Sequence, residues 1–335
     1  MTLLWVEISG ESPELARAEA VAAAEALGGR SNGADHPVPL PGLVAVEIPA
    51  ASSVADYAAR LALAHRVLVP WDPAVDPMLA LRDEGRSGQR AVVRRLGSNR
   101  GGDSDAGVRA AGGAFKDGGG RIDLERPERR FWLVGPDPSP LAEEAPVDRR
   151  AVEARRMPRL PFQRPVSLPP RLARAAANLA RARPGRAVLD PFVGTGALLA
   201  EAGLLGARLY GIDRDPAMVR GALRNLAHFH LEAAALLEGD AGEVEFSDPD
   251  LPFDAILSDP PYGRSSGTGG EAARALVDRV VPRWSERVAA GGRVVLVLPG
   301  GDPALDAPWV ERLRVPVRVH RSLTREFRVY ERAGR

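Results

Sequence analysis

The residues whose types could do chemistry most clearly are Asp259-Pro260-Pro261-Tyr262. They follow Ser258 and the apolar run 255–257, which is typical of a buried strand. The two prolines end that strand, because neither has an N–H group to donate to a helix or a sheet. The run therefore predicts a carboxylate, the Pro260 carbonyl and an aromatic ring held together at the end of a strand. These two acceptors can hold an exocyclic amino group while the ring of Tyr262 stacks on the base that carries it. The alternative is a proline turn with a surface tyrosine.

A second chemical feature is a glycine turn between the predicted strand 187–190 and the predicted helix 197–202. Glycine lets the backbone approach a ligand closely, and the start of the helix offers free N–H groups. We therefore predict that this turn binds a cofactor. The residues assigned to cofactor binding here are Asp190, Pro191, Phe192, Gly194, Thr195 and Gly196.

Two further acids end the next predicted strands. Asp213 closes the strand 209–213, and an acid about twenty residues after such a glycine turn is placed to bind ribose hydroxyl groups. Asp240 and Ala241 close a third strand end, and Asp240 is predicted to face an adenine amino group. Ligands of open α/β sheets bind at the carboxyl ends of the strands, which is where these acids are expected.

The glycine turn alone is also compatible with a dinucleotide dehydrogenase. The G-x-G-x-x-G fingerprint is incomplete, however, because Leu199 occupies the place of its third glycine. The order of glycine turn, acid, Gly-Asp and Asp-Pro-Pro-Tyr instead fits a methyltransferase that uses S-adenosylmethionine (SAM) and acts on amino nitrogens. SAM is therefore the predicted cofactor, and this chemistry requires no metal.

Composition narrows the class of protein. The chain has no cysteine, which excludes disulfides, thiolate metal sites and a cysteine nucleophile. Glu7 interrupts the apolar residues near the N-terminus, and no run approaches the roughly 18 apolar residues of a membrane helix. We expect a soluble cytoplasmic protein that needs no membrane and works as a monomer.

Positive charge is concentrated in blocks, which favours a polyanionic partner. Residues 149–186 carry 11 arginines against one acidic residue, Glu153, and a second basic block lies within 86–130. The alternative is an ordinary solvated surface. The arginines predicted to bind RNA are Arg90, Arg94, Arg95, Arg155, Arg156, Arg159 and Arg164.

Apolar patterning predicts an α/β protein of several parts. A strand at 3–8, a helix from Ser12 to Gly28, a strand at 43–48 and a helix from Ser52 or Ser53 to about His65 predict a ferredoxin-like region at 1–75. Residues 76–137 follow, with a helix at 106–116, and then a proline- and arginine-rich linker at 138–165. In the last part, 166–335, a helix at 272–290, a strand at 294–298 and a pair of strands at 313–320 and 326–331 complete a seven-stranded sheet.

These motifs together resemble a known family, the archaeal tRNA guanosine-10 N2-methyltransferases, which carry an N-terminal THUMP domain. The resemblance covers most of the chain. It rests on four segments: Asp190-Pro-Phe-Val-Gly-Thr-Gly196, Ser258-Asp-Pro-Pro-Tyr-Gly-Arg-Ser-Ser266, Arg164-Pro-Val-Ser-Leu-Pro-Pro-Arg-Leu-Ala-Arg174 and Val319-His-Arg-Ser-Leu-Thr-Arg325.

The resemblance implies a class I, Rossmann-like SAM methyltransferase domain at 166–335 and a THUMP-like RNA-binding domain at 76–137. It implies transfer of one or two methyl groups to N2 of a guanosine in tRNA, with Asp259, Pro260, Pro261 and Tyr262 as the catalytic motif. Three alternatives remain open. They are another tRNA guanosine as the target, a DNA or ribosomal RNA amino-methyltransferase, and a non-catalytic RNA-binding protein.

Overall fold

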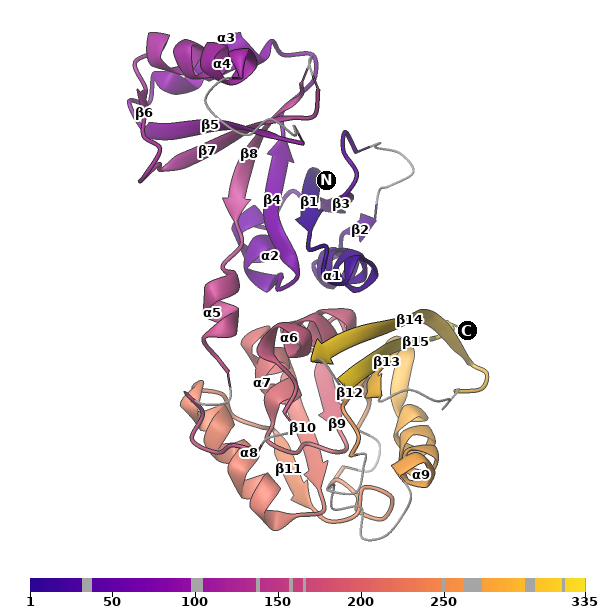
Figure 1. Cartoon of the computed structure of the whole chain (residues 1–335). Helices are drawn as coiled ribbons and strands as arrows, with labels where there is room; N and C mark the ends of the chain where they lie inside the picture. The colour runs from indigo at the N-terminus through magenta and orange to yellow at the C-terminus, as the bar shows by residue number, and fades with distance from the viewer. Residues whose placement is uncertain are drawn as a thin grey trace. The chain divides into compact units, whose positions relative to one another are not determined.

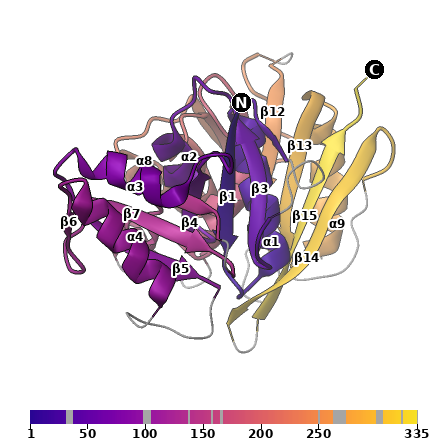
Figure 2. The ribbon, with the colours of Figure 1, turned by 90° about the horizontal axis from the view of Figure 1, so that it is seen from above.

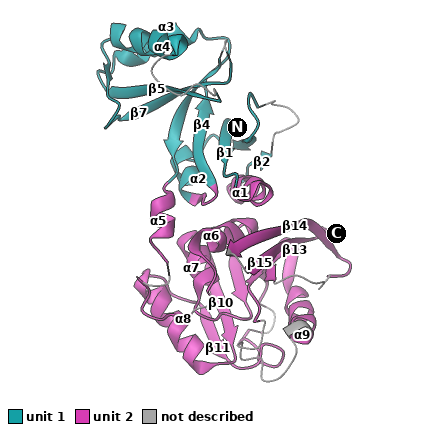
Figure 3. Cartoon of the chain, viewed as in Figure 1, with its two compact units in different colours: residues 1–10, 28–59, 64–147 teal, residues 11–27, 60–63, 148–335 magenta. Residues whose placement is uncertain are grey.

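The computed structural model describes residues 1–31, 38–97, 105–136, 139–156, 159–164, 167–248, 251–261, 273–298, 305–320 and 323–334. The chain forms two compact units, which Figure 3 shows in different colours. Unit 1 comprises residues 1–10, 28–59 and 64–147, and unit 2 comprises residues 11–27, 60–63 and 148–335. Over the described residues, no helix is long and apolar enough to cross a membrane.

Unit 1 is built on a mixed sheet whose described strands follow the order β2-β3-β1-β4-β8-β7-β5-β6. Strands β1 and β3 pair antiparallel and lie side by side in Figure 2, whereas β5 pairs parallel with β7. The strands are β1 (Thr2–Ile8), β2 (Arg30–Ser31), β3 (Leu43–Ile48), β4 (Ala64–Pro70), β5 (Arg90–Leu96), β6 (Arg121–Ile122), β7 (Arg129–Val134) and β8 (Leu141–Pro146).

Helices α3 and α4 cover one part of this sheet (Figure 1). Leu81 of α3 and Phe115 of α4 pack with Phe131 of β7 in a buried apolar cluster. Asp76 and Asp105 start these two helices, and their carboxylates accept hydrogen bonds from first-turn N–H groups that have no partner within the helix. The helices assigned mainly to unit 1 are α2 (Val54–Arg60), α3 (Pro77–Gly85) and α4 (Ala106–Asp117).

Two strands of unit 1, β4 and β8, lie where the sequence predicted a helix end and a linker. The helix expected to reach His65 ends at Arg60, and His65 lies in β4. The segment predicted as a linker contains β8, which pairs with β4 on one side and β7 on the other. Each segment gains a backbone partner from a strand distant in sequence, β4 from β1 and β8 from β4, so local patterning gave little sign of them.

Unit 2 is built on a seven-stranded sheet in the order β11-β10-β9-β12-β13-β15-β14. The strands from β11 to β13 run parallel, and β15 is antiparallel to both β13 and β14. The strands are β9 (Ala187–Asp190), β10 (Arg208–Asp213), β11 (Ala235–Glu238), β12 (Phe253–Ser258), β13 (Val288–Leu298), β14 (Trp309–His320) and β15 (Leu323–Arg332). This arrangement confirms the predicted α/β class and its seven-stranded C-terminal sheet.

Helices lie on both faces of this sheet, as right-handed crossovers on either side of β9 and β12 require. Figure 1 shows α7 and α8 on the side opposite α9. Val280 and Trp284 of α9 pack against Ile256 and Leu296 in the main apolar core. The helices of unit 2 are α1 (Pro13–Ala26), α5 (Arg149–Glu153), α6 (Pro170–Leu179), α7 (Ala197–Leu204), α8 (Pro216–His228) and α9 (Ala273–Ser285).

The C-terminal elements agree with the prediction in type and order, although their bounds differ. The predicted helix 272–290 is shorter in the structure, because α9 ends at Ser285 and β13 begins at Val288. The two predicted closing strands are confirmed as β14 and β15, which pair along most of their length.

Candidate active site

The predicted acids gather at one edge of the sheet in unit 2. Asp190 ends β9, Asp213 ends β10, Asp240 follows β11 and Asp259 follows β12. Because these strands are parallel, their carboxyl ends meet at the same edge. The strand order changes direction between β9 and β12, which is the position where open α/β sheets bind ligands. A cavity of about 790 Å³ opens there.

Most of the residues predicted from the sequence line this cavity. Pro260 is buried just behind Asp259, and Gly196 is buried at the start of α7. Tyr262 lies outside the described residues. The predicted residues on the cavity wall are Asp190, Pro191, Phe192, Gly194, Thr195, Asp213, Asp240, Ala241, Asp259 and Pro261.

The glycine turn is tied to the neighbouring strand by backbone contacts. The Gly194 N–H donates to Oδ2 of Asp213 at 2.8 Å, and the Val193 N–H donates to the Ile212 carbonyl at 2.9 Å. Gly196 has a φ of +79°, and a Cβ there would lie 3.1 Å from Cβ of Ala222. A side chain at this position would be strained as well as crowded, which explains why glycine is required.

Asp190 is almost fully buried, and burial disfavours its ionised form. Its Oδ1 accepts hydrogen bonds from the Ser258 hydroxyl at 2.6 Å and from the Phe192 N–H at 3.0 Å. Burial raises the pKa of Asp190 to about 7, and the nearby Asp259 and Asp213 add to that rise. A cationic ligand in the cavity would favour the ionised form.

The two acids predicted to bind the nucleoside differ in their surroundings. Burial raises the pKa of Asp213, whose oxygens accept from the Gly194 and Asp215 N–H groups. Asp240 instead accepts two hydrogen bonds from the guanidinium of Arg279, at 2.8 and 3.1 Å, and this contact lowers its pKa. The prediction that Asp240 faces adenine did not include this arginine.

Asp259 also has a partner that the sequence did not assign. Nη1 of Arg325, on β15, donates to Oδ1 of Asp259 at 2.5 Å. Burial raises the pKa of Asp259 to about 6, although Arg325 acts in the opposite direction. Arg325 does belong to the C-terminal motif on which the family resemblance rests, and that motif was the available signal.

The segment before α6 forms a further wall of the cavity. The Ser167 and Thr195 hydroxyls lie 2.8 Å apart, and Asn225 of α8 holds the backbone of Phe162 by two hydrogen bonds of 2.9 Å. The guanidinium groups of Arg164 and Arg224 both lie over the ring of Phe162, at 5.0 and 5.6 Å from its centroid.

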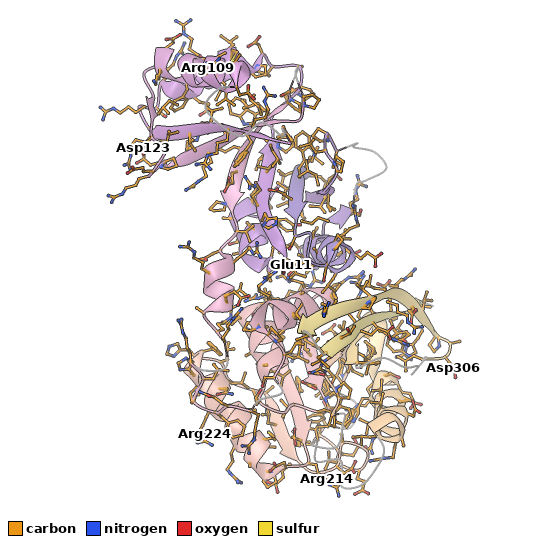
Figure 4. The ribbon with its side chains drawn as sticks, viewed as in Figure 1. Glu11, Arg109, Asp123, Arg214, Arg224 and Asp306 are labelled. Carbon is orange, nitrogen blue, oxygen red and sulfur yellow. The ribbon has the colours of Figure 1, made fainter. Side chains whose placement is uncertain are left out.

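Exposed arginines surround this part of the site. Arg214 and Arg224, labelled in Figure 4, point outward from the ribbon of unit 2. Arg164 and Arg214 also line the cavity itself. The cavity therefore combines an acidic interior with arginines at its surface.

The arginines predicted to bind RNA fall into two groups. In unit 1, the side chain of Arg95 is only 7% exposed and contacts Asp105 and Ser139. In unit 2, Arg155 donates to both oxygens of Glu201, at 2.6 and 2.8 Å. Both arginines are held by partners within the fold, and their contacts with RNA stay a prediction.

The other predicted arginines are more accessible. Arg90 is partly exposed and pairs with Glu128 and Asp123, and Arg156 pairs with Glu153. The remaining three, Arg94, Arg159 and Arg164, are exposed, and their contacts with RNA stay a prediction.

The residues present fit the predicted cofactor. SAM carries a sulfonium and an ammonium cation, and the buried carboxylate of Asp190 can neutralise positive charge in this site. The carboxylate of Asp213 lies beside the glycine turn, at the position predicted for ribose hydroxyls. Gly194 and Gly196 keep side chains away from the turn. The donor set and the cavity volume both suit a nucleoside that bears positive charge.

The chain is similar to known proteins in sequence and in structure. A family model described as an RMKL-like methyltransferase domain matches residues 158–307. The crystal structure of TrmN from Thermus thermophilus is 25% identical, with a TM-score of 0.49, and the match covers 98% of this chain and 99% of that one.

Two curated relatives carry the same name, tRNA (guanine(10)-N2)-dimethyltransferase. The Methanothermobacter thermautotrophicus protein is 36% identical over 225 residues, which is 65% of this chain and 65% of the relative. The Pyrococcus abyssi protein is 32% identical over 353 residues, which covers 98% of this chain and 99% of the relative. Because a similarity of this extent spans both units, the chain belongs to the family of tRNA (guanine(10)-N2)-methyltransferases.

Proposed function

We propose that this protein transfers methyl groups from SAM to the exocyclic N2 of a guanosine in tRNA, at position 10. The observation that carries the proposal is the placement of Asp259 on the wall of the cavity, at the carboxyl end of β12 and close to Asp190. The names of the relatives supply the substrate and the position. The dimethyltransferase relatives favour transfer of two methyl groups over one.

The chemistry follows from the nature of the amino group. Its lone pair is delocalised into the guanine ring, so the nitrogen is a weak nucleophile. Bound SAM supplies an electrophilic methyl group. The Asp259 carboxylate and the Pro260 carbonyl accept hydrogen bonds from the two N–H groups of the amino group. These hydrogen bonds orient the nitrogen so that its lone pair is directed toward the cofactor side of the cavity. The proton released from nitrogen passes to the Asp259 carboxylate or to water.

The base has to leave its stack to reach Asp259, as in other enzymes that act on bases. The proposed role of Tyr262 is to stack on the base and offset part of that cost. We assign the THUMP-like region at 76–137 and the basic segment before α6 to binding of the tRNA backbone, mainly by shape and charge. A cytoplasmic location and a monomeric state remain part of this proposal.

The proposal is tested by incubating the protein with labelled SAM and an unmodified tRNA transcript, followed by nucleoside analysis. Labelled N2-methylguanosine and N2,N2-dimethylguanosine are expected. Ribosomal RNA and DNA substrates in parallel should stay unlabelled. Label on those substrates instead of tRNA would contradict the proposal.

The matched variant in this experiment is Asp259→Asn, which keeps the shape of the side chain and removes its charge. Loss of this carboxylate should lower transfer by about 10²–10⁴-fold, the usual range for a positioned acid or base. The affinity for SAM should stay within a few-fold. A variant that transfers methyl groups at the normal rate would remove Asp259 from the mechanism.

A further inference from the structure

The contact between Arg325 and Asp259 joins two strands that are not neighbours in the sheet. Ser258, at the end of β12, pairs with Leu296 of β13, and Leu298 of β13 pairs with Glu326 of β15. Arg325 therefore lies just past the end of the pairing between β13 and β15, at the same edge as Asp259. Its side chain, which is 3% exposed, spans β13 to reach the carboxylate.

The charges around Asp259 determine how strongly this contact affects the ionisation of its carboxyl group. Asp190 on β9 faces Asp259 closely enough to raise its own pKa, and Asp213 on β10 contributes to the same rise. Arg325 on β15 is the cation that contacts Asp259 among the described residues. Even with this partner, burial leaves the pKa of Asp259 at about 6. Without it, burial and the neighbouring acids would favour the protonated form at neutral pH.

The contact gives the two oxygens of Asp259 different surroundings. Arg325 binds Oδ1. Asp259 lines the cavity, whereas Arg325 is not among the described residues on the cavity wall. Guanidinium–carboxylate hydrogen bonds are short, strong and directional, so this one fixes the rotation of the carboxylate. The second oxygen is then the one available to a ligand.

We propose that Arg325 is a positioning residue for methyl transfer: it holds Oδ1 of Asp259, aims Oδ2 at the amino group of the substrate and keeps the carboxylate ionised. This inference rests on the proposed function of Asp259 and adds a residue to it. Arg325 touches neither substrate nor cofactor in this role.

The test is the pH profile of kcat/KM, which reports ionisations of the free enzyme. The ionised carboxylate is the active form, so activity is present above the pKa of Asp259 and is lost as the pH falls through it. In the unchanged protein the acid limb should lie near the pKa of about 6. In Arg325→Gln, loss of the cation should move this limb upward by about 1–3 pH units.

If the acid limb moves upward by about two pH units, the ionised fraction of Asp259 at neutral pH falls roughly tenfold, and kcat/KM falls with it. The activity should recover at higher pH. Arg325→Lys keeps a cation, so the pH of its acid limb should lie close to that of the unchanged protein. It should not restore the full rate, because an ammonium cannot reproduce the geometry of the guanidinium. The affinity for SAM should change only a few-fold in both variants.

The matched control is Arg328→Gln. Arg328 lies on the same strand and is 1% exposed, but it pairs with Glu326 instead of Asp259. Removing it tests what the loss of a buried arginine from β15 does by itself. Its acid limb should stay near that of the unchanged protein.

A uniform loss of activity at every pH in Arg325→Gln, with an unmoved acid limb, would overturn the proposal and leave Arg325 a structural role. A second readout does not depend on tRNA: the ¹³C shift of the Asp259 carboxyl carbon, assigned by its absence in Asp259→Asn. Arg325→Gln should raise the pKa measured in this way. Failure of the unchanged protein to methylate tRNA would refute the proposed function while this titration still decides the role of Arg325.

Discussion

Asp190 is almost completely buried, and it accepts a hydrogen bond from a buried hydroxyl, that of Ser258. Burial raises its pKa to about 7, so at neutral pH a large fraction of Asp190 carries a proton. A cation bound in the cavity would lower that pKa again. The binding of a cationic cofactor is thereby coupled to release of a proton.

This coupling predicts that SAM affinity depends on pH. The ionised form of Asp190 binds the cation better, so affinity should fall as the pH drops below about 7. Over the range from about pH 7.5 to about pH 5.5, titration calorimetry should show up to about a tenfold loss per pH unit for each proton involved.

The variant Asp190→Asn should remove the part of this dependence near pH 7, and Asp259→Asn should retain it. Calorimetry in buffers of different ionisation enthalpy measures the released proton directly. An affinity that is constant over the whole range would show that Asp190 is not coupled to the cofactor.

At the same scale, the sequence predicted the acids of the site but not their partners. Asp190, Asp213 and Asp259 could be predicted because each ends an apolar strand. The contacts of Asp259 with Arg325 and of Asp240 with Arg279 could not, since they depend on strand order and helix placement.

Among the elements, α7 links the cofactor turn to the segment after α5. Glu201 of α7 is nearly buried and accepts hydrogen bonds from Arg155 and from Arg174 of α6. Two cations on one buried carboxylate satisfy its oxygens and hold three segments together. The charge of this cluster therefore serves the fold of unit 2.

This cluster predicts a loss of stability in Arg155→Ala. Glu201 would keep Arg174 but lose two hydrogen bonds, which costs about 1–3 kcal/mol for a buried charged acceptor. Urea unfolding should show the lower midpoint.

The control is Arg156→Ala, which removes an adjacent arginine whose side chain is 65% exposed and pairs with Glu153. An exposed pair contributes less than about 1 kcal/mol, so its midpoint should hardly move. Equal midpoints for the two variants would mean that the Glu201 cluster contributes little.

The elements that the sequence missed share one cause. The residues of β8 include Glu143 and Glu144 and lie between prolines, a composition typical of a linker. They form a strand because β4 and β7 offer backbone partners on both sides. The strands of unit 2 were easier to predict, since parallel strands buried on both faces appear as continuous apolar runs.

For the whole molecule, the distribution of charge predicts how tRNA binding responds to salt. Arg94 in unit 1 and Arg159 in unit 2 are exposed and belong to the predicted RNA-binding set. Each lost phosphate contact should reduce the slope of log affinity against log salt by about 0.7–0.9. Arg94→Gln and Arg159→Gln should therefore bind tRNA more weakly and with a flatter salt dependence.

Arg30→Gln is the control, because the side chain of Arg30 is 64% exposed, pairs with Glu47 and lies outside the segments assigned to tRNA binding. Filter binding or fluorescence anisotropy over a salt series gives all three slopes. Slopes in Arg94→Gln and Arg159→Gln that match the unchanged protein would mean that these arginines are ordinary surface charges.

The most direct test of the central claim compares two tRNA transcripts that differ at position 10 alone, one with guanosine and one with inosine. Inosine lacks only the exocyclic amino group, so the shape and backbone of the tRNA are kept. Labelled SAM should yield N2-methylated guanosine in the first transcript and no label in the second. Equal labelling of both transcripts would contradict transfer to N2 of guanosine 10.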